Sequence, residues 1–194
     1  MAALPAFATA ADLAAVTQSE INPSAADLAL ASASAVIRSW TRQSITRVVD
    51  DVATLRVLDE CELILPQRPV ESVSRVRVNS LTLLDWVLSG DRLLRTGGWR
   101  RLPGTTTYPD PGLVEVTYTH GWPEVPDDVR AVCLDLASMS VTNPGWLRET
   151  SDTIDDYQRR RVFAAESLGS GTLSEAHRVM LAPYRRRIGT VALR

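Results

Sequence analysis

A change of sequence period near residue 120 constrains the fold of this chain more than any other feature. Residues 113–119 alternate apolar and polar side chains, with Val114, Val116 and Tyr118 on one face. Alternation with a period of two is typical of a strand that buries one face. Gly121 ends this strand, and the residues after it follow a different period.

The second period predicts a helix over about residues 126–142. Pro126 suits a first helical turn, and the two aspartates after it place negative charge beside the unpaired amides of that turn. The apolar residues then recur at helical spacing: Val129, Val132, Cys133, Leu136, Ala137 and Ser140. We interpret this stripe as core packing.

Two helices are expected before the strands, over about residues 10–41. Thr9 and Asp12 resemble a capping box and predict a short helix over residues 10–17, and Asn22-Pro23 predicts a second helix to about residue 41. The apolar face expected on the second helix contains Leu28, Ala31, Ala35, Val36 and Trp40. The alanine side chains on this face are small enough for another helix to approach closely.

A β insertion is expected over about residues 44–119. There Val73, Val76 and Val78 are set against Arg75 and Arg77, and proline and glycine turns interrupt the pattern. The insertion separates the two N-terminal helices from the helix that begins near residue 126.

The C-terminal third is expected to contain a surface loop, a last helix and a tail. Residues 143–171 show little apolar periodicity and predict a surface loop. Thr172 and Glu175 form an S/T-x-x-E capping box, which predicts a helix over residues 172–182 that Pro183 kinks or ends. Residues 183–194 are read as a basic tail.

Length and composition predict one domain over residues 1–182, followed by that tail. With 194 residues, 45% of them hydrophobic, the chain can bury one good core. The predicted fold is α+β, a small helical bundle with a β-rich insertion between the N-terminal and C-terminal helices. The core is expected to include Trp40, Val129, Cys133, Leu136 and Leu181.

The charge pattern argues against nucleic-acid and membrane binding. The formal net charge is -2, so the chain lacks the basic field that non-specific duplex binding needs. The N-terminus has no signal-peptide pattern, and no apolar run approaches the ~20 residues of a membrane span. We expect a soluble protein made in a cytoplasm.

No catalytic, cofactor or metal set is readable. His120 and His177 belong to no catalytic or metal-ligand spacing and are interpreted as structural. Cys61 and Cys133 are expected to be buried thiols. The aspartates of residues 152–156 are read as a solvated acidic loop, and the glycine turns lack the context of a phosphate loop.

Three pieces in order resemble a known family. They are the Leu-Pro-x-x-Pro-Val turn of residues 65–70, the V-x-V-x-Y-x-x-G strand of residues 114–121, and the helix that opens at Val-Pro-Asp-Asp, residues 125–128. This order resembles the head-to-tail adaptor (head-tail connector) proteins of long-tailed double-stranded DNA bacteriophages. The resemblance covers roughly residues 12–187.

The resemblance implies a structural role in the virion neck, with assembly in the host cytoplasm. Adaptors of this family form a ring of about twelve copies. The ring lies beneath the portal protein, joins the DNA-filled head to a tail-side connector or stopper, and lets DNA pass through its lumen. The C-terminal extension grips the portal, which implies portal-binding residues here: Tyr184, Arg185, Arg186, Arg187, Val191, Leu193 and Arg194.

Two expectations follow from this reading. The tail should be mobile in the free protein and become ordered on the portal, because its arginines have little to fold against. The lumen should be acidic or neutral, because a run of arginines would hold phosphate tightly and resist DNA movement.

Two alternatives remain open. A stopper or tail-completion protein would occupy the same neck, and the neighbouring protein that it binds would distinguish it from an adaptor. A small hydrolase would use His120 with a nearby carboxylate, and loss of activity in His120→Ala would reveal it.

Overall fold

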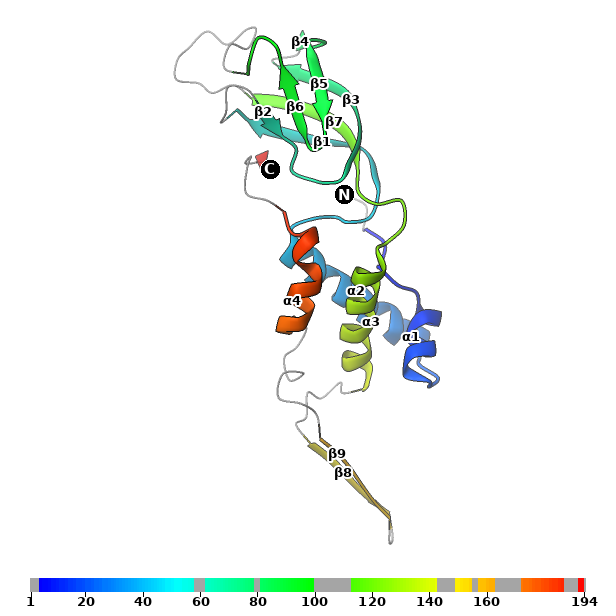
Figure 1. Cartoon of the computed structure of the whole chain (residues 1–194). Coiled ribbons are helices and arrows are strands. Elements are labelled where there is room, and N and C mark those ends of the chain that lie inside the picture. Colours follow the sequence, from blue (N-terminus) through cyan, green and yellow to red (C-terminus); the bar gives the residue numbers. More distant parts are fainter. Residues whose placement is uncertain are drawn as a thin grey trace. The chain divides into compact units, whose positions relative to one another are not determined.

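The computed structural model describes most of the chain, and the ranges it covers are residues 4–57, 62–78, 81–99, 113–142, 149–154, 157–162, 172–186 and 192–193. The fold is α+β, with helices at both ends of the sequence and a β-rich middle, as the sequence predicts (Figure 1).

The chain forms two compact units. Residues 1–42 and 125–185 form a helical unit, and residues 43–124 and 186–194 form a sheet unit. These boundaries do not coincide with the expected domain of residues 1–182 and its tail. The strands form a hydrophobic core of their own, and the expected tail is divided between the two units after residue 185.

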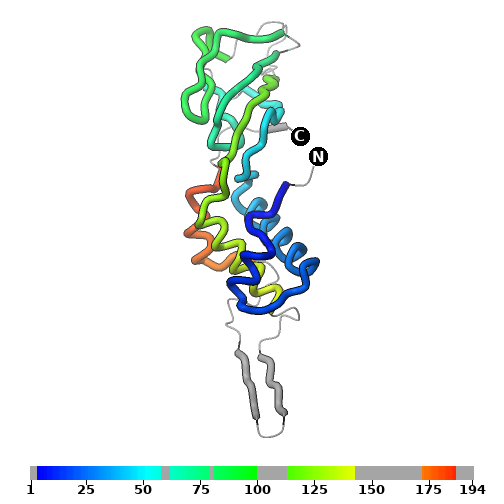
Figure 2. Tube along the Cα trace, turned by 90° about the vertical axis from the view of Figure 1, so that its right-hand side faces the viewer, coloured from blue at the N-terminus to red at the C-terminus, as the bar shows by residue number. Residues whose placement is uncertain are grey.

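The helical unit is a small bundle, in which α2 packs along α3, α1 packs on both, and α4 packs on α3 (Figures 1 and 2). Its elements are α1 (Ala10–Thr17), α2 (Pro23–Thr41), α3 (Asp127–Thr142), α4 (Glu175–Leu181) and a 3-10 turn, η2 (Ala182–Tyr184). Helices α1, α2 and α3 agree closely with the helices expected from the sequence, whereas α4 begins three residues later than expected.

The predicted starts of the first two helices are confirmed. In α1 the Asp12 amide donates to Thr9 Oγ1 at 3.2 Å, and the Thr9 amide donates to Asp12 Oδ2 at 2.9 Å. In α2 the Ser24 amide donates to Asn22 Oδ1 at 3.0 Å, with Pro23 in the first turn. Each side chain satisfies an amide that the helix leaves unpaired.

The predicted apolar face of α2 is wrong. Leu28 is 70% exposed, Trp40 is only half-buried, and Ala31 and Ala35 are exposed. The buried side consists of Ala26, Ala29, Leu30, Ala33, Ser34, Ile37 and Thr41. Because small residues occur on all sides of α2, the period alone does not select the buried face.

The stripe predicted on α3 is confirmed for Val129, Val132, Cys133, Leu136 and Ala137, all of which are buried. Only its last member, Ser140, is half-buried. Leu181 on α4 is fully buried as well, as expected.

The sheet unit contains two antiparallel sheets. One has the order β10-β1-β7-β3-β4 and the other the order β2-β6-β5. Their strands are β1 (Val48–Arg56), β2 (Glu62–Ile64), β3 (Val70–Val78), β4 (Leu81–Thr82), β5 (Trp86–Ser89), β6 (Arg92–Arg95), β7 (Leu113–His120) and β10 (Ala192–Leu193). The predicted β insertion is therefore confirmed.

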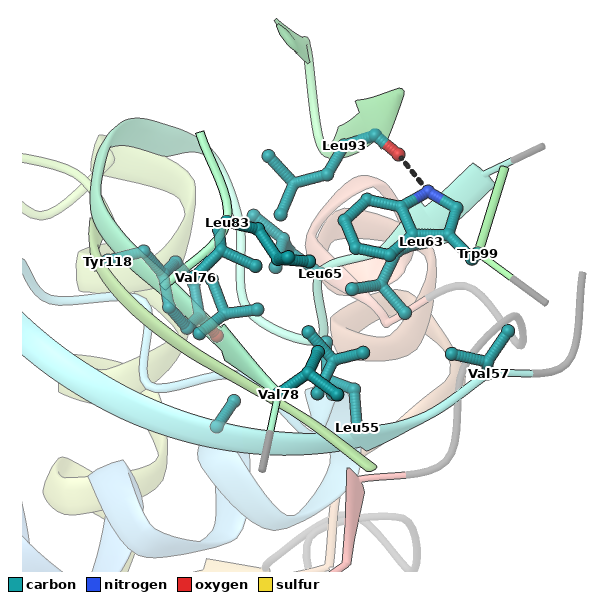
Figure 3. Close-up of a cluster of buried hydrophobic side chains, with 13 residues drawn as sticks. Leu55, Val57, Leu63, Leu65, Val76, Val78, Leu83, Leu93, Trp99 and Tyr118 are labelled. Atoms are coloured by element: carbon teal, nitrogen blue, oxygen red, sulfur yellow. Dashed lines mark hydrogen bonds between the residues drawn. The ribbon is translucent and has the colours of Figure 1, made fainter. Parts of the chain in front are cut away.

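One apolar core lies inside the sheet unit (Figure 3). Val114, Val116 and Tyr118 of the central strand β7 are fully buried, as their alternation predicts. Trp99 is also fully buried, and its indole N–H donates to the Leu93 carbonyl at 3.1 Å, which satisfies the ring's polar atom (Figure 3).

A bulge explains why the valines of β3 change phase. Val73 pairs with Tyr118 and Val76 with Val116, and the register shifts between Val73 and Arg75. The extra residue keeps Val76 in the core although it lies an odd number of positions after Val73.

The surface loop predicted over residues 143–171 contains a hairpin. Strands β8 (Glu149–Ile154) and β9 (Tyr157–Val162) pair antiparallel, with Asp152 opposite Arg159. The sequence pattern missed them because polar and charged residues dominate both strands, so neither shows an apolar alternation.

The cap predicted for α4 is wrong by two residues. Ser174, not Thr172, precedes the helix, and its hydroxyl accepts from the His177 amide at 3.2 Å. His177 takes the place of the usual glutamate, because its Nδ1 accepts from the Ser174 amide at 3.4 Å. Pro183 lies in η2 directly after α4, so the predicted helix end is confirmed.

Candidate functional site

Tyr184 and Arg185 are the first of the residues proposed to bind a portal, and both pack against other residues of the helical unit. The Tyr184 hydroxyl donates to Asp128 Oδ2 at 3.4 Å, and burial together with this carboxylate raises the pKa of Tyr184. The Arg185 guanidinium lies over the Trp40 ring, 5.2 Å from its centre. The expectation that this segment has little to fold against is therefore wrong for Tyr184 and Arg185.

The other candidates are divided between the sheet unit and undescribed positions. Arg186 belongs to the sheet unit, and Leu193 lies in β10, whose backbone pairs with β1 at Thr54. Three more candidates lie outside the described residues, namely Arg187, Val191 and Arg194. The described members of the predicted set therefore belong to two different units.

The chain enters the sheet unit after residue 42 and leaves it after residue 124. A cluster of polar residues holds the segments next to these two points in place. We call Gln43, Ser44, Gln67, His120 and Gly121 the crossing cluster, since the chain passes between units after residues 42 and 124. Gln43 is 2% exposed; its Nε2 donates to a carbonyl of the 66–69 turn at 3.0 Å, and its Oε1 accepts an amide of the same turn at 2.9 Å. Gln67 accepts from the Ser44 amide at 2.8 Å in return.

Close backbone contact completes this cluster. Gly121 has φ +92°, and an added Cβ would lie 2.3 Å from the Thr46 carbonyl oxygen. Ile45 has φ 64°, which is a strained conformation for a β-branched residue. Its carbonyl accepts from the Trp122 amide at 2.8 Å, and this bond holds the strained segment against the end of β7.

His120 joins the crossing cluster to β1. Its Nε2 lies 3.1 Å from Asp51 Oδ2 and its Nδ1 lies 3.4 Å from Ser44 Oγ. A carboxylate only accepts, so Nε2 carries the proton and Nδ1 accepts from the Ser44 hydroxyl. Burial lowers the pKa of His120, and the hydrogen bond and charge of Asp51 oppose that shift.

This Ser-His-Asp grouping has the geometry of a structural network. His120 is 1% exposed, so a substrate cannot reach the imidazole. The contact of 3.4 Å to Ser44 is long for an O–H···N bond, and the same hydroxyl lies 3.4 Å from the Thr46 carbonyl. The three side chains therefore tie together three segments of the sheet unit.

His177 plays a similar part in the helical unit. It caps α4 through Nδ1, and its Nε2 donates to Asp135 Oδ2 at 2.8 Å on α3. One side chain thus starts a helix and attaches it to its neighbour, which agrees with the structural role expected for it.

The remaining chemical candidates form no site within the described residues. No group of three or more potential ligands gathers there around a metal position. Asp152 lies on β8, whereas residues 155 and 156, like Cys61, lie outside the described part of the chain; Cys133 is a buried free thiol. No described helix is long and apolar enough to cross a membrane.

Sequence reasoning missed most of the crossing cluster. The partners of His120 lie 76 and 69 positions before it, and those of Gln43 lie 23 and 25 positions after it. No short motif carries such spacings. The turn at residues 65–70 and Gly121 were visible, but the residues that bind them were not.

Comparison with known proteins gives a structural likeness alone. No family model matches the chain, and no curated protein sequence matches it. A chain in the neck of an empty gene transfer agent particle, computed with C6 symmetry, is similar in fold, with a TM-score of 0.61 at 19% identity over 96% of this chain and 94% of that one. The chain shares its fold with a neck protein.

Two further structures agree. A chain in the neck of the native particle, computed with C12 symmetry, gives a TM-score of 0.53 at 18% identity over 96% of this chain and 93% of that one. A chain of the native gene transfer agent virion gives 0.52 at 16% identity over 93% and 90%. At the level of the fold, the resemblance to phage neck proteins is confirmed.

Proposed function

We propose that this chain is the structural adaptor of a phage-like neck. About twelve copies form a ring that docks beneath the portal and links the DNA-filled head to the tail-side connector proteins. The carrying observation is the similarity in fold, over 96% of this chain, to chains in necks of gene transfer agent particles that were computed with C6 and C12 symmetry. The ordered sequence pieces that resemble adaptors support the same role independently.

The ring is tested by measuring mass in solution. We expect the purified chain, alone or mixed with the cognate portal protein, to form a ring of about twelve copies, because closed cyclic symmetry satisfies a single head-to-tail interface. Analytical ultracentrifugation of both samples gives the stoichiometry. A chain that stays monomeric with portal but binds a tail-side protein would instead be a stopper or tail-completion protein.

The C-terminal residues from Tyr184 onward are proposed to contact the portal. Arg185 is exposed at the end of the helical unit, where a guanidinium can pair with carboxylates of a partner. Tyr184 and Arg185 already pack on Asp128 and Trp40, so the portal would meet a preformed end.

Co-sedimentation with portal tests this contact. We expect loss of binding in a chain that lacks residues 187–194, and weaker binding in Arg185→Glu, with both variants still folded. Arg178→Glu is the matched control, since Arg178 is an exposed arginine on α4 that precedes the proposed segment. Unchanged binding by the truncated chain would remove the C-terminal segment from the portal interface.

DNA is proposed to pass through the ring without being gripped. The net charge of -2 agrees with an acidic or neutral lumen, since phosphate binding rises with every arginine that faces DNA. Filter binding to duplex DNA at physiological salt should therefore show no affinity tighter than about 10⁻⁴ M, the weak end of non-specific binding. An assembled ring whose lumen is dominated by arginine would contradict this.

A further inference from the structure

The β8–β9 hairpin separates its charges by strand. Strand β8 contains Glu149 and Asp152 and no basic residue, whereas strand β9 contains three arginines at residues 159–161 and no acidic residue. Within the hairpin Asp152 lies opposite Arg159, and opposite charges at such positions stabilise a strand pair. In sequence, each strand therefore carries one sign of charge.

Both outer edges of this hairpin lack a partner strand among the described residues, because its sheet consists of β8 and β9 only. A two-stranded hairpin is marginally stable in water by itself, and its edges expose unpaired backbone amides and carbonyls. The acidic edge of β8 suits a basic strand and the basic edge of β9 suits an acidic one. The same hairpin on a second copy of the chain supplies both.

We propose that neighbouring copies join these hairpins edge to edge, with β9 of one copy beside β8 of the next. The proposal rests on the ring of the proposed function and identifies one contact that closes it. Because β8 and β9 run antiparallel, copies related by rotation place β9 antiparallel to the next β8. Acidic and basic strands then alternate around the ring, and closure leaves no edge unpaired.

A second copy fits this surface better than a different protein. A portal or tail protein would have to bring a basic strand to β8 and an acidic strand to β9, whereas rotation of one hairpin provides both. The necks that contain the similar fold were computed with C6 and C12 symmetry, and a head-to-tail contact between copies requires cyclic symmetry of this kind.

Charge exchange between the two strands tests the proposal. The exchanged variant carries Glu149→Arg and Asp152→Arg on β8 with Arg159→Glu, Arg160→Glu and Arg161→Glu on β9. Its hairpins remain complementary to each other, so it should form rings by itself. Mixed with the wild-type chain, it should form separate rings, because basic would meet basic and acidic would meet acidic. Native mass spectrometry of an isotope-labelled mixture measures this, with portal added if the ring requires it.

A half-exchanged variant, with the three Arg→Glu changes only, places acidic strands side by side and should lose at least about tenfold in ring yield. Exchange of the exposed ion pair Arg47–Glu71, a charge change outside the hairpin, should leave ring yield unchanged. Circular dichroism establishes that each variant is folded.

The possible failures can be told apart. Rings that mix wild-type and exchanged chains at random, or a half-exchanged variant that assembles normally, would overturn the hairpin contact and leave the adaptor ring intact. A wild-type chain that forms no ring with or without portal would overturn the proposed function, and the hairpin contact with it.

Discussion

Leu28 and Leu30 are two positions apart on α2, yet one is 70% exposed and the other 1% exposed. Leu30→Ala should lower the free energy of unfolding by about 2–5 kcal/mol, because it removes buried apolar contacts and leaves a cavity. Leu28→Ala should change it by less than about 0.5 kcal/mol. Urea denaturation of both variants measures the difference, and equal midpoints would mean that the buried face of α2 is wrongly assigned.

Gly121 provides a second test at the scale of single residues. An alanine there would combine an unfavourable φ of +92° with a backbone clash at the Thr46 carbonyl. Gly90 is the matched control, since it has φ +62° and no neighbour within 4 Å of an added Cβ. Gly90→Ala should cost about 1–2 kcal/mol of stability and Gly121→Ala clearly more. If thermal denaturation shows equal losses, the close approach is not rigid.

His120 predicts a pH dependence. Burial lowers its pKa from the ordinary value of 6.5, so in acid the unfolded chain takes up a proton that the folded chain resists. Stability contributed by neutral His120 is thus fully present above the unfolded pKa and falls as pH drops toward the folded pKa, by at most about 1.4 kcal/mol per pH unit.

The measurement compares wild type with His120→Gln, which cannot titrate. Between about pH 7.5 and pH 5.5 the wild-type unfolding midpoint should fall more steeply than that of the variant. Parallel curves would show that His120 is protonated as readily in the folded chain as in the unfolded one.

Local chemistry was readable at this scale only where partners are close in sequence. The Thr9–Asp12 capping box joins residues three apart and was predicted, whereas the bonds of His120 to Ser44 and Asp51 join residues 76 and 69 apart. Such a network depends on which strands become neighbours. Local sequence patterns do not encode that choice.

At the scale of elements, α4 gives a direct comparison between sequence and structure. Ser174→Ala should cost about 1 kcal/mol, because it removes the hydroxyl that accepts the His177 amide. Thr172→Ala, at the position that the sequence favoured, should stay within about 0.5 kcal/mol. Chemical denaturation of the two variants decides between the caps. A larger effect at Thr172 would restore the sequence-based assignment.

Elements with strong periodicity were predicted, and those shaped by irregular pairing were not. The stripe of α3 identifies its buried face, because the other side of the helix is polar. The alternation of β7 identifies its apolar side, although Thr117 and Thr119 on the polar side are buried as well. The bulge of β3 and the β8–β9 hairpin carry no such contrast. Only pairing with another strand reveals them.

At the scale of the whole molecule, the strands and the helices each form their own core. All members of the sheet-unit core lie between Ala53 and Tyr118, and the crossing cluster also lies within residues 43–124. Chain length alone favoured one core, because a chain of this size can bury little more. The insertion supplies the apolar residues of the sheet-unit core.

The insertion should therefore fold when expressed alone as residues 43–124. Among the described residues, none outside this range belongs to its core, and β10 pairs there at Thr54 and Leu55 of β1. Loss of such a short edge strand removes few backbone hydrogen bonds and leaves the central strand β7 paired on both sides.

We expect the fragment of residues 43–124 to give a dispersed amide NMR spectrum and a cooperative thermal transition. As a control, Val116→Ala in the same fragment should lower its midpoint, because Val116 is fully buried. A fragment that shows neither dispersion nor cooperative melting would mean that the sheet unit depends on the helices for its stability.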